Sequence, residues 1–377
     1  MGKQVKTPRF YVDMVTFLHA TGQLGWDSDN GGAELLYMNC ANPYTKQIDT
    51  TGPNEVARIG DKDDNTTKTS FPVNFCALLN HNLAFNTNTF KFYGKHGLTS
   101  DTTDVIFEPI NQILNSNNSS TEINPTYNGT TIFDFDSSNE YWRAFSIYYG
   151  NNNPIDVGTQ QLGSMVVGKY FDCPNSPDLN ITMSRRFDGI KRQRTVGGKT
   201  LANIYYDGPT EWTMNNANGT YKYPPFELDL ATGITALTVD DEETPDIDES
   251  NLSQVTSEFN QRVKSGIGRK GLRSWKLTFS YISESDMWID NEVSNTLISD
   301  GESNPENNDP NPMLSDNSFN FVWNCTLGGT LPFIFTDDKD SNEPDRYAIC
   351  NFRENSLSVQ QVAFNTYKVS MTIDEIA

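Results

Sequence analysis

The chain contains 377 residues, of which 28 are Lys or Arg and 49 are Asp or Glu, so its formal net charge is −21 with neutral histidines. Hydrophobic residues make up only 36%, but aromatic residues make up 12% and are numerous enough to build several β-type cores. We therefore expect a folded, acidic protein. Its charge argues against nucleic acid or an anionic membrane as the main partner.

The cysteines and the N-terminal residues indicate where the protein is made. The first residues lack the apolar run of a secretion signal, and no stretch approaches the roughly 18 apolar residues of a membrane-spanning helix. The cysteines are scattered without a C-x-x-C pair, so we expect buried thiols in a protein made in a reducing cytosol. They are Cys40, Cys76, Cys173, Cys325 and Cys350.

The first half of the chain alternates apolar and polar residues as strands do. Residues 9–20 indicate a strand or a short amphipathic segment that needs a partner, and residues 115–131 indicate a polar loop. Further strands are predicted at 71–79, 89–93, 104–110, 132–135, 141–149 and 162–171. Short aromatic strands between turn residues favour a β-sandwich or a jelly roll.

Charged segments interrupt the strands of the second half. Residues 185–199 carry six basic side chains, residues 262–276 carry six more, and residues 240–249 carry seven acidic ones. Residues 299–317 consist mainly of Asn, Pro, Ser, Asp and Glu and indicate a loop or a mobile insertion. Helical periodicity is weak and confined to residues 251–264. Strands are predicted at 273–282, 331–335, 347–352 and 366–373.

Two glycine-rich motifs match phosphate-binding loops only in part. Gly266-Ile-Gly-Arg-Lys-Gly271 is a G-x-G-x-x-G sequence, but a dinucleotide site needs a helix after it and a strand is predicted there. Gly198-Lys-Thr200 matches the end of a P-loop, but Gln193 stands where the first glycine is required. We interpret the first motif as a flexible turn and the second as a hairpin turn, and we expect no cofactor.

Patterns for catalysis and for metal binding are also missing from the sequence. His19, His81 and His96 have no metal-ligand spacing, and no G-x-S-x-G nucleophile motif occurs. Calcium-loop beginnings at Asp61 and Asp338 lack the glycine and the twelfth, acidic ligand, which leaves open only a calcium site of another kind. A carboxylate pair for sugar hydrolysis is recognised by its separation in space, which the sequence does not give. We expect the protein not to be an enzyme.

The two basic runs are the most informative charges, because twelve of the 28 cations fall within them. Together with the acidic block at 240–249 they indicate complementary patches on neighbouring copies of the chain. A solvated face and a nucleic-acid contact are the alternatives, and Phe187 alone supplies the aromatic stacking that the second would need between Arg185 and Lys199. The candidate assembly residues are Arg185, Arg186, Arg192, Arg194, Arg269, Lys270 and Arg273.

Several segments of the chain resemble tail proteins of tailed bacteriophages. The segment Ala77-Leu-Leu-Asn-His-Asn-Leu83, with residues 141–147 and 162–171, is similar to their galactose-binding-like jelly-roll modules. The similarity continues at residues 269–283, 347–353 and 367–375. The resemblance implies a structural component of the tail tip or baseplate, of the distal-tail type and assembled as a symmetric ring. It brings no catalytic residue, and the insertions at 240–249 and 299–317 depart from it.

We therefore predict an all-β protein in which a jelly-roll or β-sandwich domain is combined with a second β-sandwich domain of the tail-ring type. The expected divisions are an N-terminal strand or arm at 1–34, a jelly roll at 35–180 and a β-rich assembly domain at 181–377, with mobile acidic loops near 240–250 and 299–317.

The expected function is that of a bacteriophage tail-tip or baseplate ring protein, made in the host bacterial cytoplasm and located in the virion tail. Its expected partners are its own copies in a ring-like homo-oligomer and other phage tail proteins, with a host surface glycan as a further candidate. Two alternatives remain: a carbohydrate- or host-receptor-binding tail module, and a polysaccharide hydrolase.

Overall fold

The structure is a computed structural model. Antiparallel strands make up most of its described residues, which also include three short helices. The described residues are 4–21, 48–50, 55–60, 71–81, 89–96, 104–118, 121–125, 129–136, 142–149, 160–186, 190–204, 212–216, 219–223, 272–289, 317–343 and 346–376. The predicted all-β class is confirmed. None of the helices within these residues is long and apolar enough to cross a membrane.

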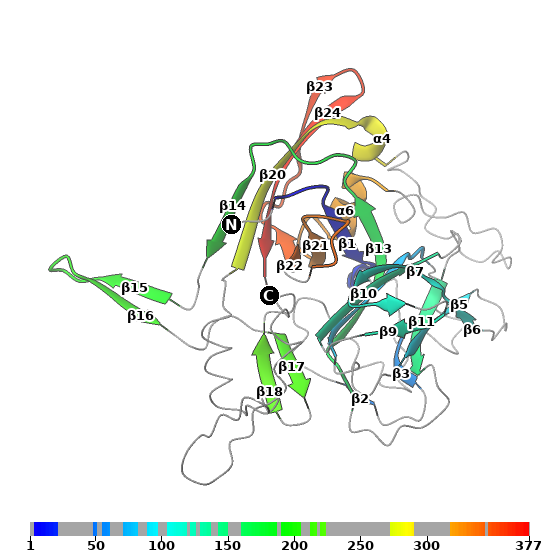
Figure 1. Ribbon diagram of the computed structural model, residues 1–377. Helices are drawn as coiled ribbons and strands as arrows, with labels where there is room; N and C mark the ends of the chain where they lie inside the picture. Colours follow the sequence, from blue (N-terminus) through cyan, green and yellow to red (C-terminus); the bar gives the residue numbers. More distant parts are fainter. Residues whose placement is uncertain are drawn as a thin grey trace, which may run out of the picture.

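One sheet of eleven strands runs through the molecule (Figure 1). The strand β1 (Arg9–Asp13) lies in its middle, because it pairs with β13 (Ser164–Asp172) on one side and with β21 (Phe333–Thr336) on the other. The N-terminal strand therefore joins strands from both halves of the chain, and the sheet is continuous across residue 180. The partner that residues 9–20 were predicted to need is this pair of strands.

On the side of β13 the sheet continues through β4, β10 and β7. On the side of β21 it continues through β22, β24, β20 and β14, and β23 also pairs with β24. The bounds of these strands are β4 Phe75–His81, β7 Pro109–Leu114, β10 Gly129–Phe135, β14 Thr182–Arg186, β20 Leu272–Ser283, β22 Tyr347–Phe352, β23 Ser358–Ala363 and β24 Thr366–Glu375.

A second sheet of six strands packs against one end of the large sheet and forms a sandwich with it. Phe92 of the second sheet lies 5.5 Å from Phe133 and 5.1 Å from Phe135 of β10, measured between ring centroids. These rings are buried, so their apolar surface holds the two layers together. The strands of the second sheet are β3 Glu55–Gly60, β5 Phe90–His96, β6 Asp104–Ile106, β8 Asn117–Asn118, β9 Ile123–Asn124 and β11 Trp142–Tyr149.

The helices cover the same face of the large sheet toward its other end. In α6 (Phe319–Cys325), Phe319 lies 4.9 Å from Phe171 of β13 and 5.2 Å from Phe279 of β20. Ser318 caps α6 by accepting a hydrogen bond from the backbone N–H of Phe321 at 3.2 Å. The other two helices are α1 Met14–Ala20 and α4 Glu284–Met287.

The opposite face of the large sheet carries a second apolar cluster. Tyr11 and Phe75 pack there edge to face with ring centroids 5.0 Å apart, beside the buried side chains of Val166, Ile334 and Tyr347. Strand β17 (Trp212–Asn216) lies against β4 and β10. Three two-stranded units complete the fold: β2 Ile48–Thr50 with β12 Gln160–Leu162, β15 Ile190–Arg194 with β16 Thr200–Ile204, and β17 Trp212–Asn216 with β18 Gly219–Tyr223.

Candidate assembly interface

The first basic run lies on two elements at the edge of the molecule. Strand β14 ends the large sheet and carries Arg185 and Arg186, and all five of its residues are exposed. The hairpin of β15 and β16 follows and points away from the body of the protein (Figure 1). We call residues 190–204 the basic arm. Sequence analysis predicted the turn between β15 and β16 but not the strand β15, because its charged residues hide the apolar alternation by which strands are recognised.

The turn of the basic arm shows why the sequence forms a hairpin here. The N–H of Thr195 donates to the carbonyl of Lys199 at 2.8 Å, and the N–H of Gly198 donates to the carbonyl of Thr195 at 2.9 Å. Gly198 has a φ of +79°, which glycine adopts without steric cost. The prediction of a hairpin turn at Gly198-Lys-Thr200, in preference to a phosphate-binding loop, is confirmed.

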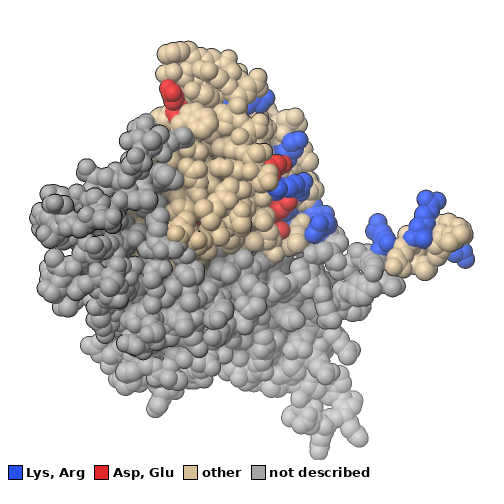
Figure 2. All heavy atoms as spheres, turned by 180° about the vertical axis from the view of Figure 1, so that it is seen from behind, with Lys and Arg blue, Asp and Glu red and all other residues tan. Residues whose placement is uncertain are grey.

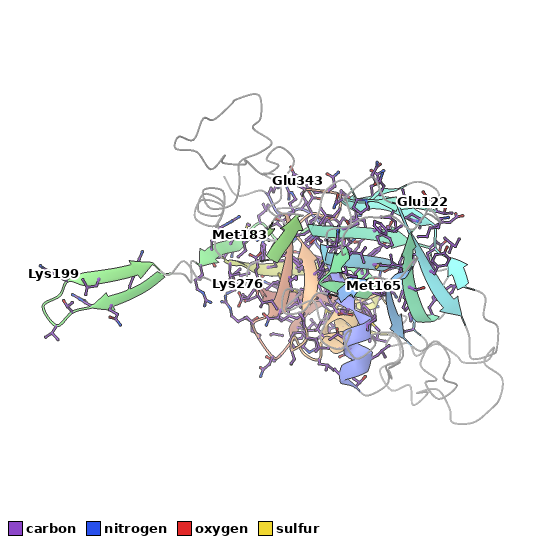
Figure 3. All side chains as sticks on the ribbon, turned by 90° about the horizontal axis from the view of Figure 1, so that it is seen from below. Glu122, Met165, Met183, Lys199, Lys276 and Glu343 are labelled. Atoms are coloured by element: carbon purple, nitrogen blue, oxygen red, sulfur yellow. The ribbon has the colours of Figure 1, made fainter. Side chains whose placement is uncertain are left out.

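The arm combines positive charge with exposed apolar groups. Arg192, Arg194 and Lys199 are exposed and form no ion pair with a described residue. Figure 3 shows Lys199 at the tip of the arm, away from the body of the protein. No acidic residue occurs between positions 190 and 204, although the whole chain carries a net charge of −21. Val196 at the turn is fully exposed, and Leu201 is 55% exposed. In the sequence, Leu201 belongs to the short alternating run Thr200-Leu-Ala-Asn-Ile204, which directly follows the basic residues of the arm.

An isolated two-stranded hairpin is marginally stable in water, and a third strand or a packed surface normally supports it. Strand β15 pairs with β16 alone among the described strands. Figure 2 shows the arm standing clear of the body, with its Lys and Arg side chains on the outside. Within the described residues, the hairpin therefore lacks the third strand or packed surface that normally supports such a unit.

Beside the arm, the outer edge of the sheet carries charges of both signs (Figure 2). Arg353 donates two hydrogen bonds of 2.7 Å to Asp374 on β24. Although partial burial acts to raise the pKa of Asp374, hydrogen bonds from Arg353 and Ser274 and the charge of Arg186 lower it below its usual range. Arg186 therefore lies where it already interacts with a carboxylate of its own chain, unlike the cations of the basic arm.

Arg273 does not belong to this exposed set, and its expected role at an interface between copies is corrected. Its side chain is only 7% exposed and donates to Glu375 through Nε at 2.9 Å and through Nη2 at 2.8 Å. The guanidinium also lies 5.1 Å from the ring centroid of Trp275. Arg273 is buried because β20 places it beside the carboxylate of Glu375 at the end of β24. The two residues are 102 positions apart in the chain, so the sequence near Arg273 does not indicate this contact.

The remaining parts of the charge pattern lie outside the described residues. These are Arg269, Lys270, the acidic block at 240–249, the G-x-G-x-x-G motif and the insertion at 299–316. The strand predicted after that motif is confirmed, since β20 begins at Leu272. Four of the seven candidate residues therefore remain as an exposed group: Arg185, Arg186, Arg192 and Arg194.

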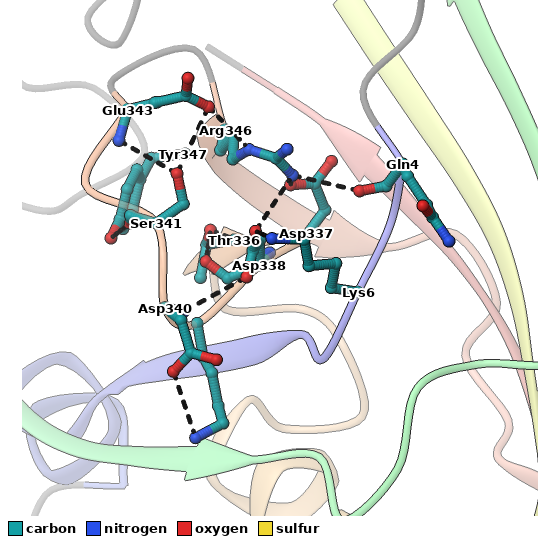
Figure 4. A network of polar contacts seen from close by, with 11 residues as sticks. Gln4, Lys6, Thr336, Asp337, Asp338, Asp340, Ser341, Glu343, Arg346 and Tyr347 are labelled. Atoms are coloured by element: carbon teal, nitrogen blue, oxygen red, sulfur yellow. Dashed lines mark hydrogen bonds and ion pairs between the residues drawn. The ribbon is translucent and has the colours of Figure 1, made fainter.

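The calcium-like sequence at Asp338 lies in a network with cations of the chain itself (Figure 4). Lys6 Nζ lies 2.9 Å from the carboxylate of Asp338, and Arg346 Nη1 lies 2.9 Å from that of Asp337. Arg346 also donates to the carbonyl of Gln4 at 3.2 Å. The network fastens the N-terminal residues to the turn after β21. No cluster of His, Cys, Asp and Glu suited to a metal ion occurs within the described part of the chain.

His81 lies at the end of β4, where its ring is 1% exposed. Its Nε2 lies 2.9 Å from the hydroxyl oxygen of Thr131 on β10. Burial lowers the pKa of His81 to about 3, so the ring is neutral at physiological pH. These contacts support a structural role for His81 within the large sheet.

Four cysteines lie within the described residues, and all four are buried and free of disulfides. Burial raises the pKa values of the Cys76, Cys173 and Cys325 thiols, which keeps them protonated. They act as small apolar residues of the core, as predicted, while Cys40 lies outside the described residues.

The site is therefore a projecting, positively charged and partly apolar hairpin beside an exposed sheet edge. Comparison with protein-family models, with curated proteins and with solved structures found no match for this chain.

Proposed function

We propose that this protein is a structural subunit of a bacteriophage virion, at the tail tip or baseplate, which joins tail parts by assembling with its own copies into a symmetric ring. The observation that carries the proposal is the basic arm, an exposed hairpin without an acidic residue on a strongly acidic chain. The resemblance of residues 77–83, 141–147 and 162–171 to tail jelly-roll modules supplies the virion setting.

In this proposal the basic arm of one subunit binds an acidic surface of the next. A head-to-tail contact of this kind joins two different surfaces and closes into a ring when the rotation allows it. Identical subunits of charge −21 repel one another, so a stable ring needs opposite charges facing each other at the contact. Arginine suits the contact because its planar guanidinium holds a carboxylate through two hydrogen bonds.

The projecting form of the arm supports the same assignment. Its apolar residues Val196 and Leu201 would lose their contact with water when the arm lies on a neighbour, which adds a favourable term that salt does not screen. The charged contacts are screened over a Debye length of roughly 8–10 Å at physiological salt. We therefore expect added salt to weaken assembly by screening the charged contacts, while the apolar contact of Val196 and Leu201 remains.

The experiment is a charge reversal confined to the arm. The variant carries Arg192→Glu, Arg194→Glu and Lys199→Glu, and the matched control carries Arg192→Lys, Arg194→Lys and Lys199→Arg. All three side chains are exposed, so both variants should fold. We expect the control, which keeps every positive charge but loses the guanidinium groups at positions 192 and 194, to form rings that dissociate at lower salt than those of the wild type. We expect the reversal to form no rings in electron micrographs. Wild-type rings from the reversed variant would contradict the proposal.

A further inference from the structure

A second exposed edge of the large sheet lies at β23, away from the basic arm (Figure 1). Strand β23 pairs with β24 on one side, and no described strand pairs with its other side. Five of its six residues are exposed, and Val359 alone is half-buried. An open edge of this kind presents backbone N–H and C=O groups that are ready to pair with another strand.

The edge at β23 lacks the charges that usually protect such strands. Residues 355–367 include no Lys, Arg, Asp or Glu and no Pro, in a chain of which 20% is charged. At one end of the same sheet, the edge strand β14 carries Arg185 and Arg186. Charged residues and Pro on an edge strand oppose pairing with another chain. The sheet is therefore protected at β14 and unprotected at β23.

Exposed apolar side chains gather at the same end of the sheet. Phe364, in the turn between β23 and β24, is 89% exposed, and Val362 is 44% exposed. Tyr281 on the neighbouring β20 is 78% exposed and has a φ of +63°, at a shift in register that precedes the pairing of Ile282 with Tyr367. Bulges of this kind redirect a side chain. Val362 and Phe364 therefore form an apolar margin at the open edge, and Tyr281 lies on the other side of β24 near the same turn.

We propose that β23 pairs antiparallel with β23 of a second copy across a two-fold axis, so that the two large sheets become one. The contact is self-complementary, and it is separate from the head-to-tail contact of the basic arm. Around an axis normal to the sheet, the residue nearest the axis faces its own copy. A Gln amide both donates and accepts hydrogen bonds, so Gln360 or Gln361 satisfies this position.

A second copy is the partner that the charges favour. A charged residue at the axis would face a like charge, which destabilises a strand pair, and β23 has none. Two chains of charge −21 repel each other over most of their surfaces, and the repulsion is weakest where a long uncharged segment faces its copy. Pairing of the backbones also covers Val362 and Phe364 with apolar and amide groups of the neighbour.

The test places like charges at Gln360 and Gln361 in both copies, and then mixes variants of opposite charge so that the two copies attract each other again. One variant carries Gln360→Lys and Gln361→Lys, a second carries Gln360→Glu and Gln361→Glu, and the uncharged control carries Gln360→Thr and Gln361→Thr. The wild type and the Thr control are studied at high salt, which screens the arm contact. The charged variants and the Thr control are also compared at low salt in a chain that carries the arm reversal, where the arm contact is absent and the new charges are not screened. Sedimentation and native mass spectrometry give the masses. Circular dichroism checks that each variant retains the β-rich spectrum.

We expect dimers from the wild type and the Thr control. The Lys and Glu variants alone should dissociate at least about tenfold more readily, and their equimolar mixture should recover a mixed dimer. Recovery in the mixture separates loss of pairing from loss of folding. A monomeric wild type at high salt, or a Lys variant that dimerises as well as the control, would overturn the inference. The arm reversal should leave this dimer intact, so the two proposals fail separately.

Discussion

Arg273 on β20 and Glu375 on β24 form an ion pair with two side-chain hydrogen bonds, of 2.9 and 2.8 Å, between residues that are 102 positions apart in the chain. Glu375 also accepts a hydrogen bond of 2.7 Å from the backbone N–H of Arg273, and the guanidinium donates to the carbonyl of Tyr347 on β22. Three strands of the large sheet are thus joined at one buried point. A cation that the sequence suggested for contacts between subunits instead stabilises the subunit itself.

The first prediction concerns this ion pair. Arg273→Ala should lower the free energy of unfolding by about 3–5 kcal/mol, because it leaves the Glu375 carboxylate buried without its partner. The double variant Arg273→Met with Glu375→Met should recover much of the loss, since neither charge remains buried. Urea denaturation measures both. A single variant as stable as the wild type would show that the pair is not buried as described.

The second prediction uses the buried ring of His81. Its pKa is about 3 in the folded protein and about 6.5 when unfolded, so the unfolded state binds the proton more readily between these values. The wild-type ring therefore makes stability rise with pH in this window, by up to about 1.4 kcal/mol per pH unit. In His81→Gln, stability relative to the wild type should fall as pH rises from about 4 to 6. Urea titrations over this range measure the difference, and parallel curves would contradict it.

The third prediction concerns Asp13, whose contribution to stability changes with pH in the opposite direction to that of His81. Asp13 lies at the start of α1 and accepts a hydrogen bond of 3.1 Å from the N–H of Thr16. Burial raises the pKa of Asp13 to about 6, although hydrogen bonds from Thr16 act to lower it. The folded state therefore binds the proton more readily than the unfolded state, and stability from this group is lost as pH rises toward 6.

Asp13→Asn keeps a hydrogen-bond acceptor at the helix start and removes the charge. Stability relative to the wild type should then rise between about pH 4 and 6, by up to about 1.4 kcal/mol per pH unit. The two groups nearly cancel in the wild type, so His81→Gln and Asp13→Asn should deviate from it in opposite directions. Deviations in the same direction would contradict the burial of one of the two groups.

The fourth prediction concerns access to the basic arm. Trypsin should cut the free subunit after Arg192, Arg194 or Lys199. These residues are exposed, and no further described strand pairs with the hairpin to hold it in place. Assembly should slow this cut, because the arm then lies on a neighbour. Mass spectrometry of timed digests identifies the cut, and a small peptide substrate controls for effects of salt on the protease. Equal rates in the free and assembled states would exclude the arm from the interface.

Much of the strand content could be predicted from the sequence, because local alternation is enough to recognise it. Phe75–His81, Trp142–Tyr149, Leu272–Ser283 and Tyr347–Phe352 all lie where apolar and polar residues alternate or where short apolar runs end at turns. The predicted polar loop at 115–131 contains the short pairing strands β8 and β9 and the start of β10, which carry too few apolar residues to be recognised. The helix α6 has only seven residues and little periodicity.

The way in which the strands combine could not be predicted from the sequence. Nothing in Arg9–Asp13 indicates that one of its partners is Phe333–Thr336, because register is set by packing between distant segments. The turn of the arm was predicted at Gly198-Lys-Thr200, but the projection of the hairpin from the body was not, because that depends on the rest of the fold. The buried position of Arg273 depends on its contact with Glu375. The two residues are 102 positions apart, so no local pattern in the sequence indicates the contact.

The mass of the purified particle as a function of salt tests the central claim most directly. Sedimentation at low salt should give a particle of several chains for the wild type, with a mass that falls as salt rises, because the arm contacts are screened. The variant with Arg192→Glu, Arg194→Glu and Lys199→Glu should sediment at low salt as the smaller species that the wild type forms at high salt. A wild type with the mass of a single chain at low salt, or a reversed variant with the wild-type mass, would contradict assembly through the basic arm.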